Sequence, residues 1–332
     1  MNHKHPYLIV LIAAALAGIV LLIAPFIGLR FIAPAQLTGD PLAQQIFWFM
    51  RVPRVLVAFL AGGTLALCGM VFQAMFRNPL AEPFTLGISS GASFGAALCM
   101  LLNISGSFLG LPLSSIGALC GALCAMAIVY GITMMQRTVS NYTMLLAGIA
   151  VSFTFSSLIL FIQYLSDMTH SFQIIRWLMG GVEVYGYQSL FSMMPILLIG
   201  LMLIVFNLPV LDHLLSGDDL AQSRGVNVAQ VKRLLLLATS LCAGSIVAVC
   251  GPIGFVGMMI PHVCRLAGTT RHTMLGPLSF LTGGIFLVAA DTLARTIIAP
   301  AEIPVGIITA LFGGPFFLWI LLNRNKNSSH LF

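Results

Sequence analysis

Apolar segments of about 20 residues recur along almost the whole chain, which is the length an α-helix needs to cross a bilayer. The chain is 59% hydrophobic and only 7% charged, whereas soluble domains average about 25% charged residues. We therefore predict an all-α, polytopic membrane protein. About ten spans are expected, at 7–29, 54–75, 84–103, 112–135, 143–164, 189–210, 231–250, 255–267, 274–297 and 304–322.

Two details of this span pattern bear on the organisation of the chain. The first apolar run, residues 7–29, is too long for the core of a signal peptide and is interpreted as the first span. The eighth is short, so nine spans remain an alternative to ten. Residues 166–187 are polar enough to include a short interfacial helix. Without any linker or soluble segment, residues 1–332 are predicted to form a single transmembrane domain.

The distribution of basic residues predicts the orientation in the membrane. With the N-terminus inside, ten Lys and Arg residues lie beside the inner ends of the spans and five beside the outer ends. Cytoplasmic loops carry the excess of Lys and Arg, so both termini are expected in the cytoplasm. This bias also accounts for the net charge of +6. No basic cluster is interleaved with aromatic residues, so we expect no nucleic-acid partner.

A polar stretch at residues 212–233 (DHLLSGDDLAQSRGVNVAQVKR) interrupts the apolar sequence on the predicted inner side. Ser216 is a candidate N-cap, with Asp219 three residues later at the capping-box spacing. Asp218 and Asp219 suit the N-terminus of a helix and Arg224 suits its C-terminus. Gly225 is able to adopt the left-handed conformation that ends a helix. The sequence thus predicts one short capped helix between spans six and seven.

Glycine and proline cluster at three places within the apolar sequence. Asn78-Pro79 and Glu82-Pro83 precede span three, Gly251-Pro252 precedes span eight, and Gly313-Gly314-Pro315 is expected to interrupt span ten. Broken helices at membrane depth occur where they are buried or line a water-filled cavity, which loosely favours a transporter. Three further glycines form a GxxxGxxxG row that suits close helix packing or, alternatively, a pore lining: Gly87, Gly91 and Gly95.

Enzyme and metal motifs are weak throughout the sequence. The seven cysteines lie in or beside apolar segments without a CxxC pair, so neither a disulfide framework nor a zinc site is predicted. We identify no catalytic residues and no cofactor bound by this chain. No GxxxxGK[ST] motif occurs. If ATP drives this protein, a separate chain must bind it.

Three arginines on the predicted outer side stand apart because that side is otherwise poor in positive charge. Arg51 and Arg54 flank a Val-Pro pair at the start of span two, and Arg295 ends span nine within DTLAR. They are either interfacial anchors or docking residues for an acidic partner outside the membrane.

Several of these segments together resemble the permease family of bacterial ABC importers for iron-siderophores, haem and cobalamin. The similarity extends over essentially the whole chain and lies in 51–54 (RVPR), 76–83 (FRNPLAEP), 86–95 (LGISSGASFG), 251–265 (GPIGFVGMMIPHVCR) and 291–295 (DTLAR). It implies a ten-helix permease subunit in the bacterial cytoplasmic membrane that pairs with a second permease, expected to be an identical copy. Two cytoplasmic ATPase subunits, which carry ATP and Mg²⁺, and a periplasmic binding protein would complete the importer.

The resemblance also implies roles for particular residues. Arg51, Arg54 and Arg295 would form salt bridges with the binding protein. The segment 217–227 would rest in a cleft of the ATPase, with coupling residues Gly217, Asp218, Asp219, Leu220, Ala221, Arg224 and Gly225. Two loops resemble an inner gate, with Asn78 and Leu80 after span two and Ser140 and Asn141 before span five.

The expected function is import of a ferric siderophore by alternating access, with haem and cobalamin as the alternative cargoes. A secondary transporter driven by an ion gradient is a second class. It would usually carry a carboxylate near the bilayer midplane, and Glu82, Asp291 and Glu302 all fall near predicted helix ends. A membrane-embedded enzyme is a third class, for which the sequence offers no catalytic constellation.

Overall fold

The computed structural model describes residues 6–104, 106–108, 110–135 and 141–324, and within them the chain is almost entirely helical. The elements in chain order are α1 Pro6–Ile23, η1 Ala24–Phe26, α2 Gln36–Gly39, α3 Pro41–Gln45, η2 Ile46–Arg51, α4 Val52–Phe76, η3 Pro83–Leu86, α5 Ile88–Leu101, β1 Ser107–Phe108, β2 Leu111–Pro112, α6 Leu113–Met134, α7 Asn141–Leu165, α8 Met168–Leu178, α9 Gln188–Leu215, α10 Asp218–Ser223, α11 Val228–Cys250, α12 Val256–Leu266, α13 His272–Ala294 and α14 Val305–Arg324.

The predicted spans correspond to helices of this structure, and the all-α polytopic prediction is confirmed. Among the described residues, seven helical segments are long and apolar enough to cross a membrane, and α5, α12 and α14 are shorter apolar helices. Each of the ten predicted ranges falls on one of these ten elements. The helix predicted within 166–187 is α8. The short helices α2 and α3 and the π-helical turn η2 before α4 were not predicted.

Helix α4 lies at the centre of the bundle, and every residue from Ala61 to Phe76 is buried. Glycines allow its neighbours to approach. A Cβ atom on Gly62 would overlap the backbone of Gly283 in α13, and one on Gly69 would overlap Gly257 in α12. Close backbone contact through small residues is the usual way in which membrane helices pack. The central position of α4 thus follows from its small residues.

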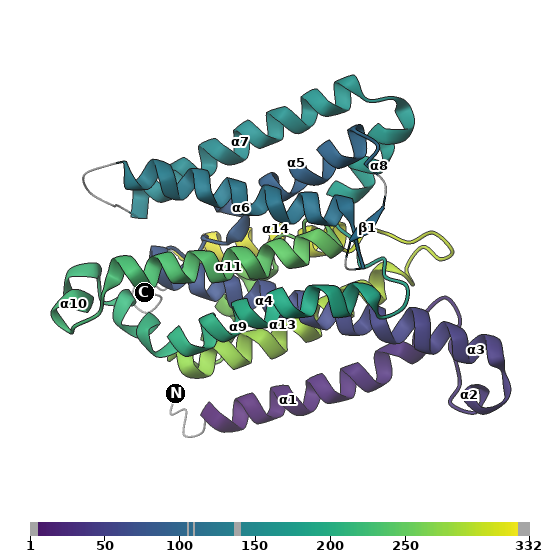
Figure 1. Ribbon diagram of the computed structural model, residues 1–332. Coiled ribbons are helices and arrows are strands. Elements are labelled where there is room, and N and C mark those ends of the chain that lie inside the picture. Colours follow the sequence, from purple (N-terminus) through teal and green to yellow (C-terminus); the bar gives the residue numbers. More distant parts are fainter. Residues whose placement is uncertain (1–5, 105, 109, 136–140, 325–332) are drawn as a thin grey trace.

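Peripheral helices present apolar side chains outward, as a lipid environment requires. In the most apolar 18-residue stretch of the segment that contains α1, only 17% of the residues are buried, compared with 89% in that of the segment that contains α4. In Figure 1, α1 lies along one edge of the bundle and α5, α6 and α7 along the opposite edge, with α4, α9, α11 and α13 between them. Helix α10 and the start of α1 lie at one end, whereas α2, α3 and the β1–β2 hairpin lie at the other.

Two local predictions were wrong. Helix α14 is continuous from Val305 to Arg324 with Pro315 inside it, so Gly313-Gly314-Pro315 does not interrupt span ten. The glycine serves packing instead, because the Phe255 ring occupies the space that a Cβ on Gly313 would need. Ser216 is not an N-cap, since α9 continues to Leu215 and Ser216 ends it; the N-cap of α10 is Gly217.

Candidate functional site

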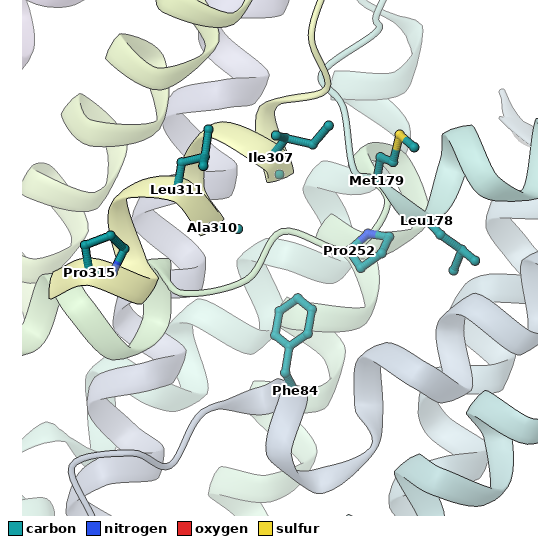
Figure 2. Close-up of a pocket in the computed structure, with 9 residues that line it drawn as sticks. Phe84, Leu178, Met179, Pro252, Ile307, Ala310, Leu311 and Pro315 are labelled. Carbon is teal, nitrogen blue, oxygen red and sulfur yellow. The ribbon is translucent and has the colours of Figure 1, made fainter. Parts of the chain in front are cut away.

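An open apolar pocket of about 550 Å³, called the cavity below, lies where α14 meets η3, the end of α8 and the segment before α12. This volume is in the range of small-molecule sites. Figure 2 shows Phe84 of η3 projecting toward Pro252, with α14 residues on one side and the end of α8 on the other. All the lining residues are nonpolar: Phe84, Leu178, Met179, Pro252, Gly306, Ile307, Ala310, Leu311 and Pro315. Such a lining offers shape and apolar contact rather than charge or metal ligands.

The helix breaks beside this cavity are built by their own sequences. Pro83 occupies the first turn of η3, where its missing N–H costs no hydrogen bond. Thr85 and Glu82 form a capping box, in which the Glu82 N–H donates to Thr85 Oγ1 at 3.3 Å. At the other break, Gly251 adopts a φ of 66°, which favours glycine. The two breaks predicted before spans three and eight therefore converge on one cavity wall.

Backbone hydrogen bonds join three segments around the cavity: the end of α11, the residues after α8 and the start of α14. The Gly181 N–H donates to the carbonyl oxygen of Cys250 at 2.8 Å, and the Gly306 N–H donates to that of Gly180 at 3.2 Å. A Cβ on Gly180 would overlap the Pro252 carbonyl. Irregular backbone at membrane depth is tolerated only where such partners exist or water reaches it. The cavity is thus bounded by a braced framework.

Helix α8 supplies Leu178, Met179 follows directly after it, and the helix is fixed at both ends by polar contacts. Asp167 caps it by accepting from the backbone N–H of His170 at 2.8 Å, a hydrogen bond that lowers the pKa of this carboxyl group. Near its C-terminus, Arg176 donates to Glu183 at 2.7 Å, and this hydrogen bond raises the pKa of the guanidinium. Both contacts are exposed, so they orient α8 without entering the cavity.

The three predicted docking arginines are engaged within the protein. Arg54 binds Asp291 through two nitrogens, at 2.9 Å from Nη2 to Oδ1 and 3.0 Å from Nε to Oδ2, and it also binds Glu302 at 2.8 Å. Arg295 lies 3.4 Å from the same aspartate. Only 15% of the Arg54 side chain, 5% of Arg295 and 2% of Asp291 are exposed, against 44% of Glu302. In the predicted orientation these four residues lie at the outer end of the bundle, and we call them the outer cluster.

Arg51 lies beside the outer cluster but is satisfied by backbone rather than by a carboxylate. Its Nη1 donates to the carbonyl oxygens of Pro25 and Phe26 at 3.1 and 3.0 Å, and its Nη2 donates to that of Arg30 at 2.6 Å. The residue is buried. Arg51 and Arg295 are thus buried and Arg54 is paired within the protein, and the docking role of these three arginines stays a prediction.

At the opposite end, the predicted coupling residues lie on and around α10. Ala221 is fully buried, whereas Leu220 is 54% exposed and Asp219, Arg224 and Gly225 are also exposed. Gly217 adopts a φ of 116°, a conformation that L side chains rarely reach. Helix α10 therefore packs against the bundle through Ala221 and exposes its other face.

Asp218 binds the bundle rather than capping α10. Its carboxylate accepts from Lys232 of α11 at 2.5 Å and from Arg77 at 3.4 Å. Sequence reasoning treated Asp218 as a helix stabiliser and missed both partners, because they lie 14 and 141 positions away. We call Asp218, Lys232 and Arg77 the inner cluster.

The predicted gate residues are only partly described. Asn78 accepts from the Leu80 N–H at 2.9 Å and so forms a tight turn after α4, with Leu80 47% exposed. Asn141 is the first residue of α7, and Ser140 lies outside the described residues. The structure therefore places one of the two predicted gate loops and shows that this loop is internally bonded, while its role as a gate stays a prediction.

The glycine row lies in a helix contact and not on the cavity wall. Cβ atoms on Gly91 and Gly95 would overlap the backbone of Gly121 and Gly117 in α6. Gly87 adopts a φ of 81° between η3 and α5. Among the residues that the structure describes, no group of three or more His, Cys, Asp or Glu could hold a metal ion.

The fold defines a class, that of polytopic helical membrane proteins, and comparison with known proteins makes it specific. The family model described as the FecCD transport family matches residues 7–323. The hemin transport system permease protein HmuU of Yersinia pestis is 38% identical over 86% of this chain and 85% of its own. The cobalamin import system permease protein BtuC of Halobacterium salinarum is 37% identical over 90% of this chain and 79% of its own.

A solved structure agrees with these sequence relatives. A metal-chelate type ABC transporter in an inward-facing conformation superimposes with a TM-score of 0.85 at 29% identity, covering 95% of this chain and 99% of that chain. The chain therefore belongs to the FecCD transport family. It is an ABC importer permease, as its resemblance to this family predicted.

Proposed function

We propose that this chain translocates a ferric siderophore across the bacterial cytoplasmic membrane by alternating access, with haem or cobalamin as the alternative cargo. The observation that carries the proposal is the apolar cavity at the meeting point of the helix breaks. A cavity without charged groups provides a path for a large chelate while binding it weakly, which suits a cargo delivered by another protein. Its volume of about 550 Å³ in one chain would grow if a second copy faced it.

The same proposal includes the partners of the chain. A second permease copy, two ATPase subunits that bind ATP and Mg²⁺, and a substrate-binding protein would complete the importer, with both termini of this chain in the cytoplasm. The exposed face of α10 supports an ATPase contact there. Closure of the ATPase pair would move α10 and rock the helices between two states.

Transport by the reconstituted complex tests the function and the cargo together. The permease, its cognate ATPase and its binding protein are placed in liposomes, and uptake of a ferric siderophore, haem and cobalamin is measured with and without ATP. We expect ATP-dependent uptake of the siderophore and little uptake of the others. Uptake driven by an ion gradient without the ATPase would contradict the proposal and favour a secondary transporter.

A matched pair of tryptophan substitutions tests whether the cavity is the path. Ala310 is exposed to the cavity, so Ala310→Trp should fill it without disturbing the core and should reduce uptake to a small fraction of wild type. Ile19→Trp, on the outward face of α1, is the control and should leave uptake unchanged. Normal uptake by Ala310→Trp would show that the cargo passes elsewhere.

Docking of the binding protein is tested best at Glu302, because charge reversal of the buried Arg51 or Arg295 would disturb the fold. Glu302→Gln frees Arg54 from its exposed partner and should tighten docking about two- to fivefold at low salt, the range of an exposed ion pair. Glu183→Gln removes the carboxylate of another outer pair and is the control. Equal effects of the two variants would argue against a role for Arg54 in docking.

A further inference from the structure

We infer that the Asp218–Arg77 ion pair transmits movement of α10 directly to the loop that follows α4, and so to the cavity wall. The inference rests on the proposed function, in which α10 receives the movement of an ATPase. It adds a route that does not pass through the long helices α9 and α11. Arg77 and Asp218 are positioning residues in this scheme, because neither touches the cavity.

The geometry of Asp218 allows it to hold two elements at once. Its Oδ2 accepts from Lys232 and its Oδ1 accepts from Arg77, so the two pairings use different oxygens and do not compete. The Lys232 side chain is 7% exposed, which fixes that partner to the base of α11. The guanidinium of Arg77 also lies against the start of α10, 3.5 Å from where a Cβ on Gly217 would be.

Arg77 is the first residue of the loop and is bonded through its backbone to the last turn of α4. It ends α4 in the left-handed conformation, with a φ of 52° and its N–H donating to the carbonyl of Gln73. A residue with a Cβ rarely adopts this conformation, and its partners must maintain it. A displacement of the Arg77 side chain therefore acts on the end of α4 and on the loop together.

The rest of the loop is braced from Asn78 to the cavity. Asn78 accepts from the N–H of Leu80 through its side chain and from that of Ala81 through its carbonyl, at 2.9 and 3.1 Å. The capping box of Glu82 and Thr85 follows, and Phe84 between them lines the cavity. A braced segment moves as a unit, so displacement at Arg77 would shift Phe84.

Partial exposure makes the link breakable without loss of the fold. The Arg77 side chain is 43% exposed, and Asp218 keeps Lys232 when Arg77 is neutralised, so Arg77→Gln leaves no buried charge without a partner. Asp218→Asn also takes the carboxylate away from Lys232, whose side chain is only 7% exposed, so it costs more stability than Arg77→Gln. The effect of Arg77→Gln should therefore appear in the coupling of ATP hydrolysis to uptake, and not in stability.

The test measures cargo taken up per ATP hydrolysed in the complete reconstituted importer. We expect Arg77→Gln and Asp218→Asn each to lower this ratio about two- to fivefold. The double variant should lower it no more than the more impaired single variant, because both changes remove the same pair. Arg77→Lys, which keeps the charge, should recover part of the ratio. Arg271→Gln, an exposed arginine on the same side in the loop before α13, is the matched control and should not change it.

A second measurement needs no ATPase and separates this inference from the proposed function. In the purified permease, amide hydrogen exchange of residues 78–82 should be faster in Arg77→Gln than in wild type, while exchange in α13 stays the same. Unchanged exchange, an unchanged coupling ratio, or additive losses in the double variant would each overturn the link. Failure of the wild-type complex to couple uptake to ATP would instead reject the proposed function, and the exchange experiment would still decide whether the pair braces the loop.

Discussion

The outer and inner clusters use the same ion-pair chemistry in opposite surroundings. In the outer cluster, Asp291 is 2% exposed and binds Arg54, which lies 237 residues away in the sequence, so this pair joins α13 to α4. In the inner cluster, Asp218 is 29% exposed and joins a two-turn helix to a loop and to α11. Each aspartate faces two cations. The difference lies in how much water reaches the carboxylate.

This difference predicts different consequences for stability and for motion. Removing one member of a buried pair leaves an uncompensated charge, which is expensive, whereas an exposed pair contributes little. The outer cluster therefore fixes helix positions, and the inner cluster is suited to contacts that form and break. Three substitutions test whether burial is the property that separates them.

The largest effect is expected for Asp291→Asn. This change leaves Arg295, which is 5% exposed, without its carboxylate. It also replaces the carboxylate that accepts three hydrogen bonds from Arg54 with a neutral amide that has one acceptor oxygen. The free energy of unfolding should fall by about 3–5 kcal/mol. Thermal or denaturant unfolding in detergent measures it. Asp219→Asn, an exposed carboxylate on α10, is the control and should change stability by less than about 0.5 kcal/mol. Similar losses in the two variants would contradict the comparison.

An intermediate effect is expected for Lys232→Met. The apolar stem of lysine is largely retained by methionine, but the ammonium that binds Asp218 at 2.5 Å is lost. Asp218 keeps Arg77 and some water, so the cost should be about 1–2 kcal/mol, between the values for buried and exposed pairs. The same unfolding experiment applies. A cost as large as that of Asp291→Asn would mean that the inner cluster is as rigid as the outer one.

The sequence predicted the features of this fold that depend on local length and hydrophobicity. Among the described residues, seven of the predicted spans could be located because about 20 apolar residues mark a helix that crosses a bilayer, and the other three coincide with the shorter apolar helices α5, α12 and α14. Pro83 and Gly251 could likewise be recognised as helix breaks from their own backbone preferences. The same reasoning failed at Pro315, because one missing N–H does not end a helix that neighbouring residues hold in place by packing. Here Phe255 packs against Gly313, two residues before Pro315.

The site depended on contacts that local sequence cannot specify. Arg54 and Asp291 were both noticed, but nothing in either motif indicates that they bind each other across the bundle. The spacing of Asp291 and Arg295, four residues apart on one helix, was the one signal that could have suggested an internal pair. The convergence of Phe84 and Pro252 on one cavity likewise required the three-dimensional arrangement.

The smallest effect is expected for Glu183→Gln, which separates burial from location. The Arg176–Glu183 pair lies in the same outer half as Asp291 in the predicted orientation, yet both side chains are 59% exposed. If burial decides, the substitution should cost less than about 0.5 kcal/mol. Added salt should remove even that, because the Debye length falls to about 3 Å at 1 M. A cost of several kcal/mol that persists in high salt would show that the outer side itself, and not exclusion of water, makes ion pairs there indispensable.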